Sequence, residues 1–382
     1  MSRKNWVRER ALEIGFDRVG IARLDRAQYG PSFLDWLDRG DHAGMEYMAG
    51  RREVRLDPRL IFDGARSAIC VALQYHSEET PEEAGDLWPR VARYAKGRDY
   101  HNVMIKRLRK LARAIREEFP GTETRPYVDT GPILERSLAA AAGLGVPGKN
   151  TMLLHPEAGS YFLLGELFVS LDLAPDNPIE DLCGSCSLCL EACPTNALPA
   201  PFRLDSNRCI SYWTIEHRGA VAPDIREQIG DWVFGCDICQ EVCPHNDRVE
   251  APIDPAFDLP EQRRALDLVA LSELDESRYQ EVFQGSPMKR SRREGLRRNA
   301  IVAMGNRGDQ QYVEPLLSAL GDEDASVRLH AAWALGRIGD GGASTRLREA
   351  LEREVERTVA KEMSEALNRL SKSHDDRDLA PS

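Results

Sequence analysis

The sequence predicts a multidomain α+β fold, and three observations support this class. Helical and strand-like patterns are mixed over residues 1–178, eight of the nine cysteines lie between Cys183 and Cys243, and a segment near the C-terminus repeats after 31 residues. The 382 residues are 42% hydrophobic and 30% charged, which is typical of a soluble chain of two to four domains. The N-terminus is charged where a signal peptide is apolar, and no apolar run reaches the roughly 18 residues of a membrane span. We therefore expect a cytoplasmic protein.

The first predicted domain, residues 1–178, mixes helices and strands. Apolar residues recur near helical spacing in two segments, a third is rich in alanine, and a short apolar run indicates a buried strand; these are residues 5–15, 100–119, 133–143 and 67–73. Pro132 suits the first position of the alanine-rich helix and Gly143 suits its end. Cys70, inside the apolar run, is expected to be a small core residue.

The second predicted domain, residues 179–250, carries the cysteines. Cys183 to Pro194 has the spacing C-x2-C-x2-C-x3-C-P, in which three thiolates bind one [4Fe–4S] cluster and the fourth binds the other cluster of a pair. Cys236 to Pro244 repeats the pattern without its first cysteine, and Cys209 is the only cysteine of the region left to fill that place. Such a pair of clusters conducts electrons.

We therefore expect a crossed arrangement of ligands. One cluster would be bound by Cys183, Cys186, Cys189 and Cys243, and the other by Cys193, Cys209, Cys236 and Cys239. Structural zinc is the alternative, because C-x2-C is also a zinc-ribbon element. Zinc sites normally use two well-separated C-x2-C pairs, so the spacing favours iron–sulfur clusters.

The C-terminal part contains the repeat. Residues 298–309 match residues 329–340, and both copies end in Gly-x-x-Gly-Asp, a pattern that resembles HEAT-like helical repeats. We expect this repeat domain to cover residues 284–370 and to end in a helix over residues 346–370. The predicted boundaries also leave a connecting segment, residues 251–283, and a polar, unstructured tail, residues 371–382.

Charge is uneven along this region. The chain has 51 basic and 62 acidic residues, a net charge of −11, yet residues 284–308 hold seven basic residues and one acid, Glu294. The basic residues are Lys289, Arg290, Arg292, Arg293, Arg297, Arg298 and Arg307. A solvated helix face would explain such a strip, but a concentrated basic strip beside a repeat scaffold also fits a nucleic-acid contact.

Taken together, these motifs resemble the epoxyqueuosine reductase family, cobalamin-dependent iron–sulfur enzymes that complete queuosine synthesis on tRNA. The resemblance covers nearly the whole chain. Besides the cysteines and the repeat, it rests on the segments 53–58, 94–101, 128–136, 142–145, 148–150, 159–162 and 209–216.

The resemblance implies a nitroreductase-like N-terminal domain that binds cobalamin, and it assigns residues to that cofactor. These are Arg55, Asp129, Leu153, Leu154, His155, Leu164, Ser211, Cys236 and Asp237. The Asp-x-His-x-x-Gly signature that supplies a histidine to cobalt in some corrinoid enzymes is absent, which agrees with this family. His101 and His155 lie in family motifs, and we expect both to be neutral and hydrogen-bonded.

The resemblance also implies that Asp129 is the catalytic proton donor. From position alone, an Asp before Thr-Gly-Pro at a helix start would be a capping group. Opening an epoxide, however, produces an alkoxide that needs a proton, and a carboxylic acid facing an apolar corrin would have a raised pKa. We therefore expect Asp129 to donate to the substrate.

The expected reaction reduces epoxyqueuosine to queuosine at the wobble position of tRNA. Electrons would enter from an external flavodoxin- or ferredoxin-type donor and pass through the cluster of Cys183, then that of Cys193, to cobalamin. The anticodon stem-loop would be bound by Lys289, Arg290, Arg292, Arg293, Arg297 and Arg298. Two alternatives remain: a reductive dehalogenase-like enzyme acting on a small molecule, and a ferredoxin-type electron carrier. A monomer is expected in each case.

Overall fold

The computed structural model describes residues 1–75, 89–247, 249, 254–264, 266–339 and 342–378, without the side chains beyond residue 372. The chain forms two compact units, each assembled from segments that are separate in the sequence. The first comprises residues 1–78, 96–209 and 237–258, and the second comprises residues 79–95, 210–236 and 259–382. Among the described helices, none is both long and apolar enough to span a membrane.

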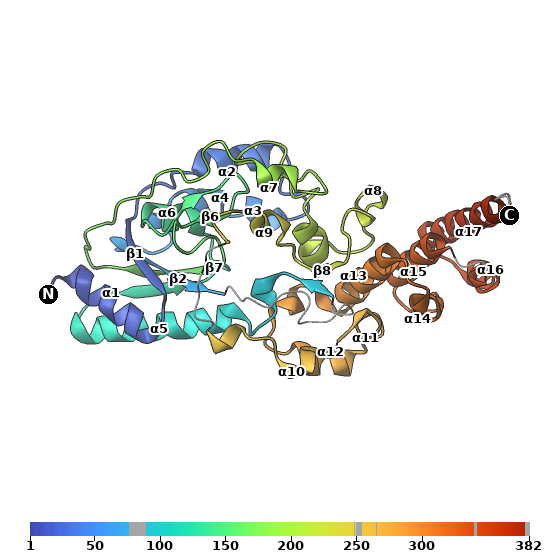
Figure 1. The fold of residues 1–382 in the computed structure, drawn as a ribbon. Helices are drawn as coiled ribbons and strands as arrows, with labels where there is room; N and C mark the ends of the chain where they lie inside the picture. Colours follow the sequence, from blue (N-terminus) through green and yellow to red (C-terminus); the bar gives the residue numbers. More distant parts are fainter. Residues whose placement is uncertain (76–88, 248, 250–253, 265, 340–341, 379–382) are drawn as a thin grey trace. The chain divides into compact units, whose positions relative to one another are not determined.

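The first unit is built on a four-stranded antiparallel sheet with the strand order β1-β2-β7-β4 (Figure 1). Its strands are β1 (Arg18–Arg23), β2 (Ser67–Gln74), β4 (Thr124–Tyr127), β7 (Phe162–Val169) and the small pair β5 (Val146–Pro147) and β6 (Leu153–Leu154). Its helices are α1 (Arg3–Ile14), α2 (Gly30–Asp38), α3 (Glu46–Ala49), α4 (Arg52–Leu56), α5 (Tyr100–Glu118), α6 (Glu135–Ala141), α7 (Leu188–Glu191) and α9 (Ile238–Glu241), with 3-10 turns η1 (Pro58–Leu60) and η4 (Pro255–Phe257).

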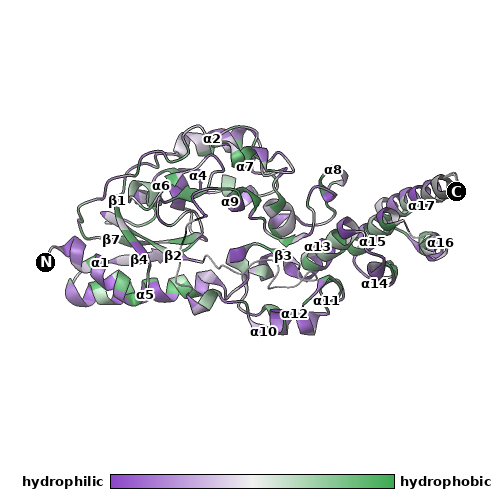
Figure 2. Ribbon diagram, viewed as in Figure 1, coloured by the Kyte–Doolittle hydropathy of each residue, from purple (hydrophilic) through white to green (hydrophobic). Residues whose placement is uncertain are grey.

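Helices cover both faces of this sheet. The apolar face of α5 packs on β4 and β7 while its charged face points away (Figure 2), and α6 packs on β1, β2 and β7. Gly165 faces α5, because a Cβ there would lie 3.1 Å from Leu108 and Met104. Side chains alternate along a strand, so the next residue, Glu166, points to the opposite face, where α6 packs.

Three of the four predicted elements of this unit are confirmed. The segments 5–15, 67–73 and 100–119 correspond to α1, β2 and α5, and Gly15 ends α1 in the left-handed conformation at φ 101°. The fourth is shorter than predicted: α6 begins at Glu135, so Pro132 is not its first residue. The preceding residues form tight turns instead, with Asp129 at φ 53° and Leu134 at φ −88°, ψ 75°.

The second unit is mainly helical. Its strands are β3 (Arg90–Val91) and β8 (Trp232–Phe234), which pair in parallel. Its helices are α8 (Pro223–Arg226), α10 (Glu261–Arg264), α11 (Leu268–Ser272), α12 (Glu276–Phe283), α13 (Arg292–Arg307), α14 (Val313–Ala319), α15 (Ala325–Ile338), α16 (Ala343–Arg353) and α17 (Arg357–Asp378), with shorter turns η2 (Arg93–Ala95), η3 (Tyr212–Glu216), η5 (Pro287–Ser291) and η6 (Gln310–Tyr312).

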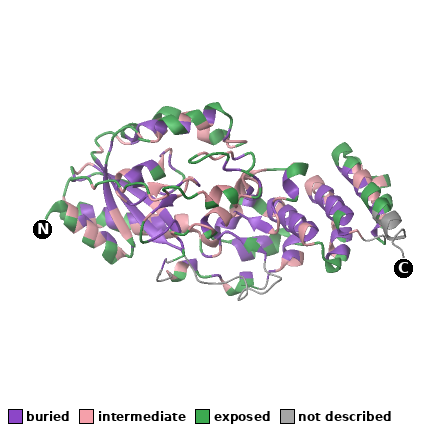
Figure 3. Cartoon of the chain, turned by 45° about the horizontal axis from the view of Figure 1, so that its top comes forward, coloured by how far each residue is buried: buried purple, intermediate pink, exposed green. Residues whose placement is uncertain are grey.

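The predicted repeat is a pair of packed helices. Its two copies lie on α13 and α15, which end at Gly308 and Gly339 in the left-handed conformation, at φ 73° and 75°; Asp340 lies outside the described residues. Helices α13, α15 and α17 stack in order, and most residues of the first two are buried (Figure 3). The stack is close-packed, because a Cβ on Gly305 would lie 2.7 Å from Trp333.

Two predictions about the C-terminus are wrong. The single helix expected over residues 346–370 is two helices, because the backbone of Glu354 is extended and ends α16. The Glu354 carboxylate accepts from the backbone N–H groups of Val355 and Glu356, and it also pairs with Arg328 at 2.7 Å. The polar segment from residue 371 is not an unstructured tail, since α17 continues to Asp378; residues 379–382 lie outside the described part. No glycine or proline interrupts this segment before Pro381.

Candidate active site and cluster segment

Asp129 lies in a turn just after β4. Its backbone has φ 53°, and its N–H donates to the carboxylate of Glu135. The side chain is 58% exposed. Asp129 is not the cap of α6, because that position belongs to Leu134. The turn therefore presents the Asp129 carboxylate at the surface of the unit instead of using it to start a helix.

His101 links Asp129 to a second carboxylate. It lies in the first turn of α5, with Nδ1 2.7 Å from Asp99 Oδ1 and Nε2 3.1 Å from Asp129 Oδ2. Burial alone would lower the pKa of His101, but hydrogen bonds and charges from Asp129 and Asp99 outweigh it and raise the pKa to about 9. The expectation of a neutral His101 is therefore wrong: at pH 7 the ring is an imidazolium between two carboxylates.

Two further carboxyl groups lie behind Asp129. Burial, together with the charge of Asp129, raises the pKa of Glu135 to about 7, and burial beside Glu135 raises the pKa of Glu166 well above its ordinary value. Neither residue was among the sequence-based candidates. The signal for Glu166 was present, because it is the single charged residue in the apolar strand 162–169.

Among the predicted cobalamin residues of the first unit, Arg55 is the one with a positive charge. Arg55 on α4 is half-buried, and its Nε has no hydrogen-bond partner in the described part. Burial lowers the pKa of Arg55, and its charge interacts with Asp129 and Glu135. An unpartnered guanidinium nitrogen in this position is suited to an amide or phosphate oxygen of a bound cofactor.

The other predicted contacts are mainly apolar, and two of them are covered by the fold. Leu153 and Leu154 form β6 and are 3% and 1% exposed, whereas Leu164 on β7 is half-buried. Burial and the nearby Arg18 lower the pKa of His155 to about 4, so this histidine is neutral as expected. Of the three leucines, only Leu164 leaves part of its side chain accessible, so their assignment to cobalamin stays a prediction.

The remaining predicted contacts are divided between the two units. Asp237 belongs to the first unit and is 3% exposed, whereas Ser211 and Cys236 belong to the second. Cys209 is in the first unit. Their assignment to cobalamin or to a cluster stays a prediction.

The cysteine segment folds into two short, similar turns, α7 and α9, that pack on one another. Burial raises the pKa of the Cys189 thiol, and the nearby thiols of Cys183, Cys243 and Cys186 raise it further. The pKa of Cys243 is likewise raised by burial and by Cys183 and Cys186. These four thiols therefore share one neighbourhood, although the cysteine at position 243 is far along the chain.

Backbone N–H groups point at two of the cysteine sulfurs. Lys149 N–H donates to Cys183 Sγ at 3.4 Å, and Ala197 N–H donates to Cys193 Sγ at 3.3 Å. Such N–H···S bonds stabilise thiolates and tune cluster potentials. Within the described residues, no group of three or more His, Cys, Asp or Glu is arranged to hold a single metal ion.

The motif Gly148-Lys149-Asn150 binds the cysteine-containing turns to the rest of the first unit. Lys149 Nζ donates to the carbonyl oxygens of Gly184 and Cys186, both at 2.7 Å, and Asn150 Nδ2 donates to the carbonyl of Cys239 at 3.1 Å. The sequence had marked this motif only as part of a resemblance. The structure gives it a role in supporting both halves of the cysteine segment.

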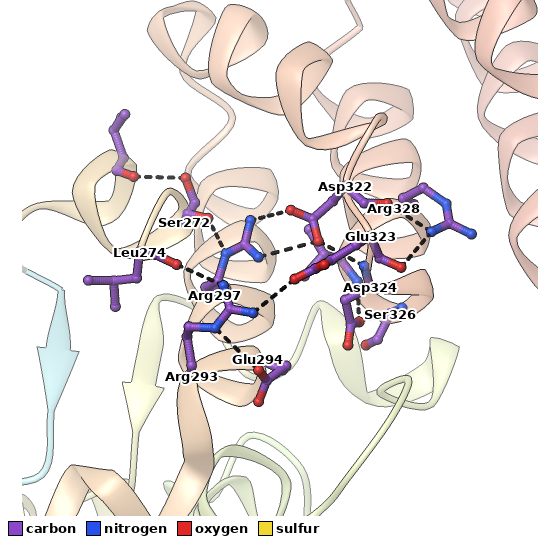
Figure 4. Close-up of polar contacts among 12 residues, drawn as sticks. Ser272, Leu274, Arg293, Glu294, Arg297, Asp322, Glu323, Asp324, Ser326 and Arg328 are labelled. Atoms are coloured by element: carbon purple, nitrogen blue, oxygen red, sulfur yellow. Dashed lines mark hydrogen bonds and ion pairs between the residues drawn. The ribbon is translucent and has the colours of Figure 1, made fainter. Parts of the chain in front are cut away.

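The basic strip has a different role from the one predicted. Arg298 is 2% exposed, and its guanidinium donates to the carbonyls of Trp213, His217 and Gly219 within the second unit. Arg297, 8% exposed, pairs with Asp322 and donates to the carbonyl of Ser272 (Figure 4). Both arginines are occupied inside the fold, so the prediction that they contact tRNA is corrected.

Two other members of the strip are also held by the fold. Arg293 lies between the carboxylates of Glu294 and Glu323 (Figure 4). It also pairs with Glu276, and its side chain is 17% exposed. Arg307 pairs with Asp231. A helix packed on both sides, as α13 is, turns its basic residues inward where they bind carbonyls and carboxylates.

Three members remain at the surface. Arg292 is exposed, and its side chain has no hydrogen-bond or ion-pair partner in the part of the chain that the structure describes. Arg290 is half exposed and pairs with Glu216 at 2.8 Å, and Lys289 donates to Gln280 at 2.7 Å. We call Lys289, Arg290 and Arg292 the exposed cation group.

Comparison with known proteins identifies three regions of the chain. Residues 55–130 match the family described as "Epoxyqueuosine reductase QueG, DUF1730". Residues 182–246 match the "4Fe-4S double cluster binding domain", and residues 288–368 match HEAT repeats. The double-cluster match covers all eight clustered cysteines and makes structural zinc the weaker alternative.

Curated relatives resemble the chain over most of its length. The epoxyqueuosine reductase of Pseudomonas aeruginosa is 40% identical, over 88% of this chain and 94% of that protein. That of Xanthomonas campestris pv. campestris is 39% identical, over 87% and 95%, and that of Escherichia coli K12 is 36% identical, over 87% and 88%.

Solved structures of the same kind have the same fold. An epoxyqueuosine reductase crystallised with an epoxyqueuosine-modified stem-loop of tyrosine tRNA is 31% identical, with a TM-score of 0.88 over 96% of this chain and 98% of that one. The Bacillus subtilis structure, with its catalytic loop swung out of the active site, is 30% identical, with a TM-score of 0.90 over the same shares.

Proposed function

The chain belongs to the epoxyqueuosine reductase family, and from this membership we propose that it reduces epoxyqueuosine to queuosine at the wobble position of tRNA. The observation within the chain that supports this best is the array Asp99, His101 and Asp129, which holds a proton next to an exposed carboxylate. Loss of the epoxide oxygen to leave an alkene consumes two electrons and two protons. An oxidoreductase of this kind needs both an electron path and a proton path.

The electron path is assigned to the cysteine segment. The double-cluster domain provides two [4Fe–4S] clusters, which carry one electron each, and cobalamin, when bound, would supply the two-electron chemistry at the epoxide carbon. Arg55, Leu153, Leu154, His155, Leu164, Ser211, Cys236 and Asp237 are the residues proposed to hold it. The unpartnered Arg55 nitrogen and the half-buried, apolar Leu164 are the features that support this assignment.

The proton path is assigned to Asp129 and His101. Asp129 is a carboxylate in the resting array, so a proton would first pass to its Oδ2 from His101 Nε2, which is charged at pH 7 and lies 3.1 Å away. Asp129 would then donate this proton to the epoxide oxygen as the C–O bond breaks, and would become a carboxylate again. Asp99 holds the ring through Nδ1 and fixes which nitrogen faces Asp129.

The same proposal covers the domains and partners. Residues 1–178 are proposed to form a nitroreductase-like domain, and residues 179–250 would bind the two clusters. Residues 251–283 would connect the cluster domain to the repeat domain, residues 284–370, which would bind tRNA. The proposed partners are the anticodon stem-loop and a flavodoxin- or ferredoxin-type donor. Neither a dehalogenase nor a simple electron carrier requires the HEAT repeats found here, whereas a tRNA substrate gives them a role.

Mass spectrometry of tRNA nucleosides tests the function directly. We expect anaerobic incubation of the loaded protein with reductant and epoxyqueuosine-containing tRNA to convert epoxyqueuosine into queuosine. A protein with full clusters and cobalamin that leaves epoxyqueuosine intact would contradict the proposal. Debromination of a small bromophenol by the same preparation would instead support the dehalogenase alternative.

The turnover rate should depend on the protonation of His101. Its pKa is raised from 6.5 to about 9, so the imidazolium and its two ion pairs are complete below about pH 6.5 and are lost as the pH rises through about 9. We expect the single-turnover rate to fall above pH 9. In His101→Gln, which keeps a hydrogen-bonding side chain but no titrating ring, this alkaline decline should disappear and the rate should be lower at all pH values. An unchanged alkaline decline in His101→Gln would assign it to another group.

Binding of tRNA should depend on the exposed cation group. We expect simultaneous replacement of Lys289, Arg290 and Arg292 by Ala to weaken the binding of the stem-loop and to reduce the slope of log affinity against log salt by about 2 to 3, roughly one for each phosphate that is no longer neutralised. Arg278→Ala is the matched control, because Arg278 is an exposed surface cation of the same unit that pairs with Glu281. An unchanged salt slope in the triple variant would place the phosphate contacts elsewhere.

A further inference from the structure

Glu166 is a carboxyl group buried in the middle of the sheet. It lies on β7 opposite Cys70 of β2 and Tyr127 of β4, and it is 0% exposed. Neither of its oxygens accepts from an N–H or hydroxyl group of a described residue. Leaving a buried polar group without a partner is unfavourable, and more so for a charged group, so this position requires an explanation.

Glu166 points to the face of the sheet on which α6 packs, and Glu135 is the first residue of that helix. The carboxyl group of Glu135 is the one that interacts with Glu166 there. Two carboxylates in contact within an apolar environment cannot both be ionised, so the pair retains one proton between them. Glu166 is fully buried whereas Glu135 is only partly so. The proton therefore resides on Glu166, which donates to Glu135, and the negative charge resides on Glu135.

Glu135 has a second contact, and it leads to the catalytic candidate. Its carboxylate accepts from the backbone N–H of Asp129. Asp129 has φ 53°, a conformation that is unfavourable for a residue other than glycine. A charged acceptor makes a stronger hydrogen bond than a neutral one and can stabilise this turn.

The charges also act on one another. Glu135 and Asp129 repel each other when both are ionised, so a charge on Glu135 favours the protonated Asp129 that a donor requires. The other titratable or charged groups facing the pair are His101 from α5, Arg55 from α4, Arg136 from α6 and Cys70 from β2. His101 acts in the opposite direction, since its positive charge favours the carboxylate of Asp129.

We propose that Glu135 and Glu166 form a carboxyl pair with a single shared proton, which positions Asp129 through its backbone amide. Glu166 keeps the proton and holds Glu135, and Glu135 holds the turn that carries Asp129. Both are positioning residues, because neither needs to touch the substrate. The inference rests on the proposed function of Asp129.

Infrared spectroscopy tests the pair itself, independently of turnover. In the anaerobically loaded protein, at a pH above the titration of Glu135 near 7, we expect the C=O stretch of a buried, protonated carboxylic acid to be present and to be missing in Glu166→Gln. Glu123→Gln, which changes an exposed glutamate of the same unit, is the control and should keep the band. Absence of the band from the wild-type protein would overturn the proposal.

Single-turnover rates over about pH 6 to 9 test the positioning role. The rate of the wild-type protein should fall as the pH drops below about 7, where Glu135 becomes protonated and its charged hydrogen bond to Asp129 weakens. Glu135→Gln keeps an acceptor oxygen but cannot titrate, so it should lose this acidic decline and turn over about 10-fold more slowly. Glu135→Ala should be about 100-fold slower, comparable to the effect of a small misplacement of a catalytic group.

The outcomes separate positioning from a purely structural role. A structural role would lower cluster content or stability in Glu135→Gln and leave the pH profile of the folded fraction unchanged, and that result would overturn the proposal. If Glu135→Ala does not fold, the isosteric Gln variant decides. If the loaded wild-type protein shows no turnover but the infrared band is present, the proposed function is contradicted. The proposed carboxyl pair with one shared proton is then still supported.

Discussion

Asp129→Asn is expected to reduce the single-turnover rate of epoxyqueuosine reduction by about 100- to 10,000-fold, the usual contribution of a general acid. Asn has nearly the same shape, can bind His101, and tolerates the left-handed backbone better than most residues, so the turn at φ 53° should persist. What the substitution removes is the transferable proton. The rate should be measured with pre-reduced protein, so that electron delivery from the external donor does not limit it.

Two comparisons make this result specific. Iron and cobalamin contents must equal those of the wild-type protein, and Asp172→Asn, a change at an exposed aspartate of the same unit, should have no effect. Asp129→Ala should be at least as slow as Asp129→Asn, because it also removes the hydrogen bond to His101. If Asp129→Ala with full cofactors turned over at the wild-type rate, Asp129 would not be the proton donor.

Features of the fold that depend on local sequence patterns were predicted correctly. Glycines in the left-handed conformation end α1, α13 and α15, and the 31-residue offset identified the two copies of the repeat. These signals depend on a few neighbouring residues and on the helical period, so they are present in the sequence alone. The break at Glu354 was missed because it depends on an ion pair with Arg328, 26 residues earlier in the chain.

The basic strip shows the limit of counting charges. The arginines of α13 were expected to form a solvent-facing patch, but α13 is packed between α11 and α15. Arg297 and Arg298 then bind Asp322 and four backbone carbonyls in the interior. Charge composition does not reveal which face of a helix is covered, and that depends on helices elsewhere in the chain.

The candidate site was found only in part for a related reason. Asp129 was identified through a resemblance, whereas its partners come from different elements: His101 from α5 and Glu135 from α6, with Glu166 behind them on β7. The protonation of His101 was wrongly predicted because it depends on two carboxylates that only the fold brings to one ring. Protonation states are set by such contacts and not by residue type.

The crossed ligation of the two clusters predicts a specific pattern of iron loss in paired cysteine variants. We propose that Cys243 shares a cluster with Cys186, and the mutual proximity of Cys183, Cys186, Cys189 and Cys243 supports this pairing. The double variant Cys186→Ser, Cys243→Ser should then damage a single cluster and keep about four iron atoms per chain. The double variant Cys186→Ser, Cys193→Ser should damage both clusters and keep almost none. Each should abolish turnover, because the electron path is interrupted.

The iron contents decide between the crossed and the uncrossed arrangement. If Cys193 instead completed the cluster of Cys183, Cys186 and Cys189, the two double variants would exchange results, and the one that includes Cys193 would keep about four iron atoms. Cys70→Ala is the control, because Cys70 is buried in the sheet and should leave all the iron in place. Low-temperature electron paramagnetic resonance of the reduced variants adds a second measurement. A single surviving [4Fe–4S]⁺ centre should give a simple signal, whereas two neighbouring reduced centres give one broadened by their magnetic interaction.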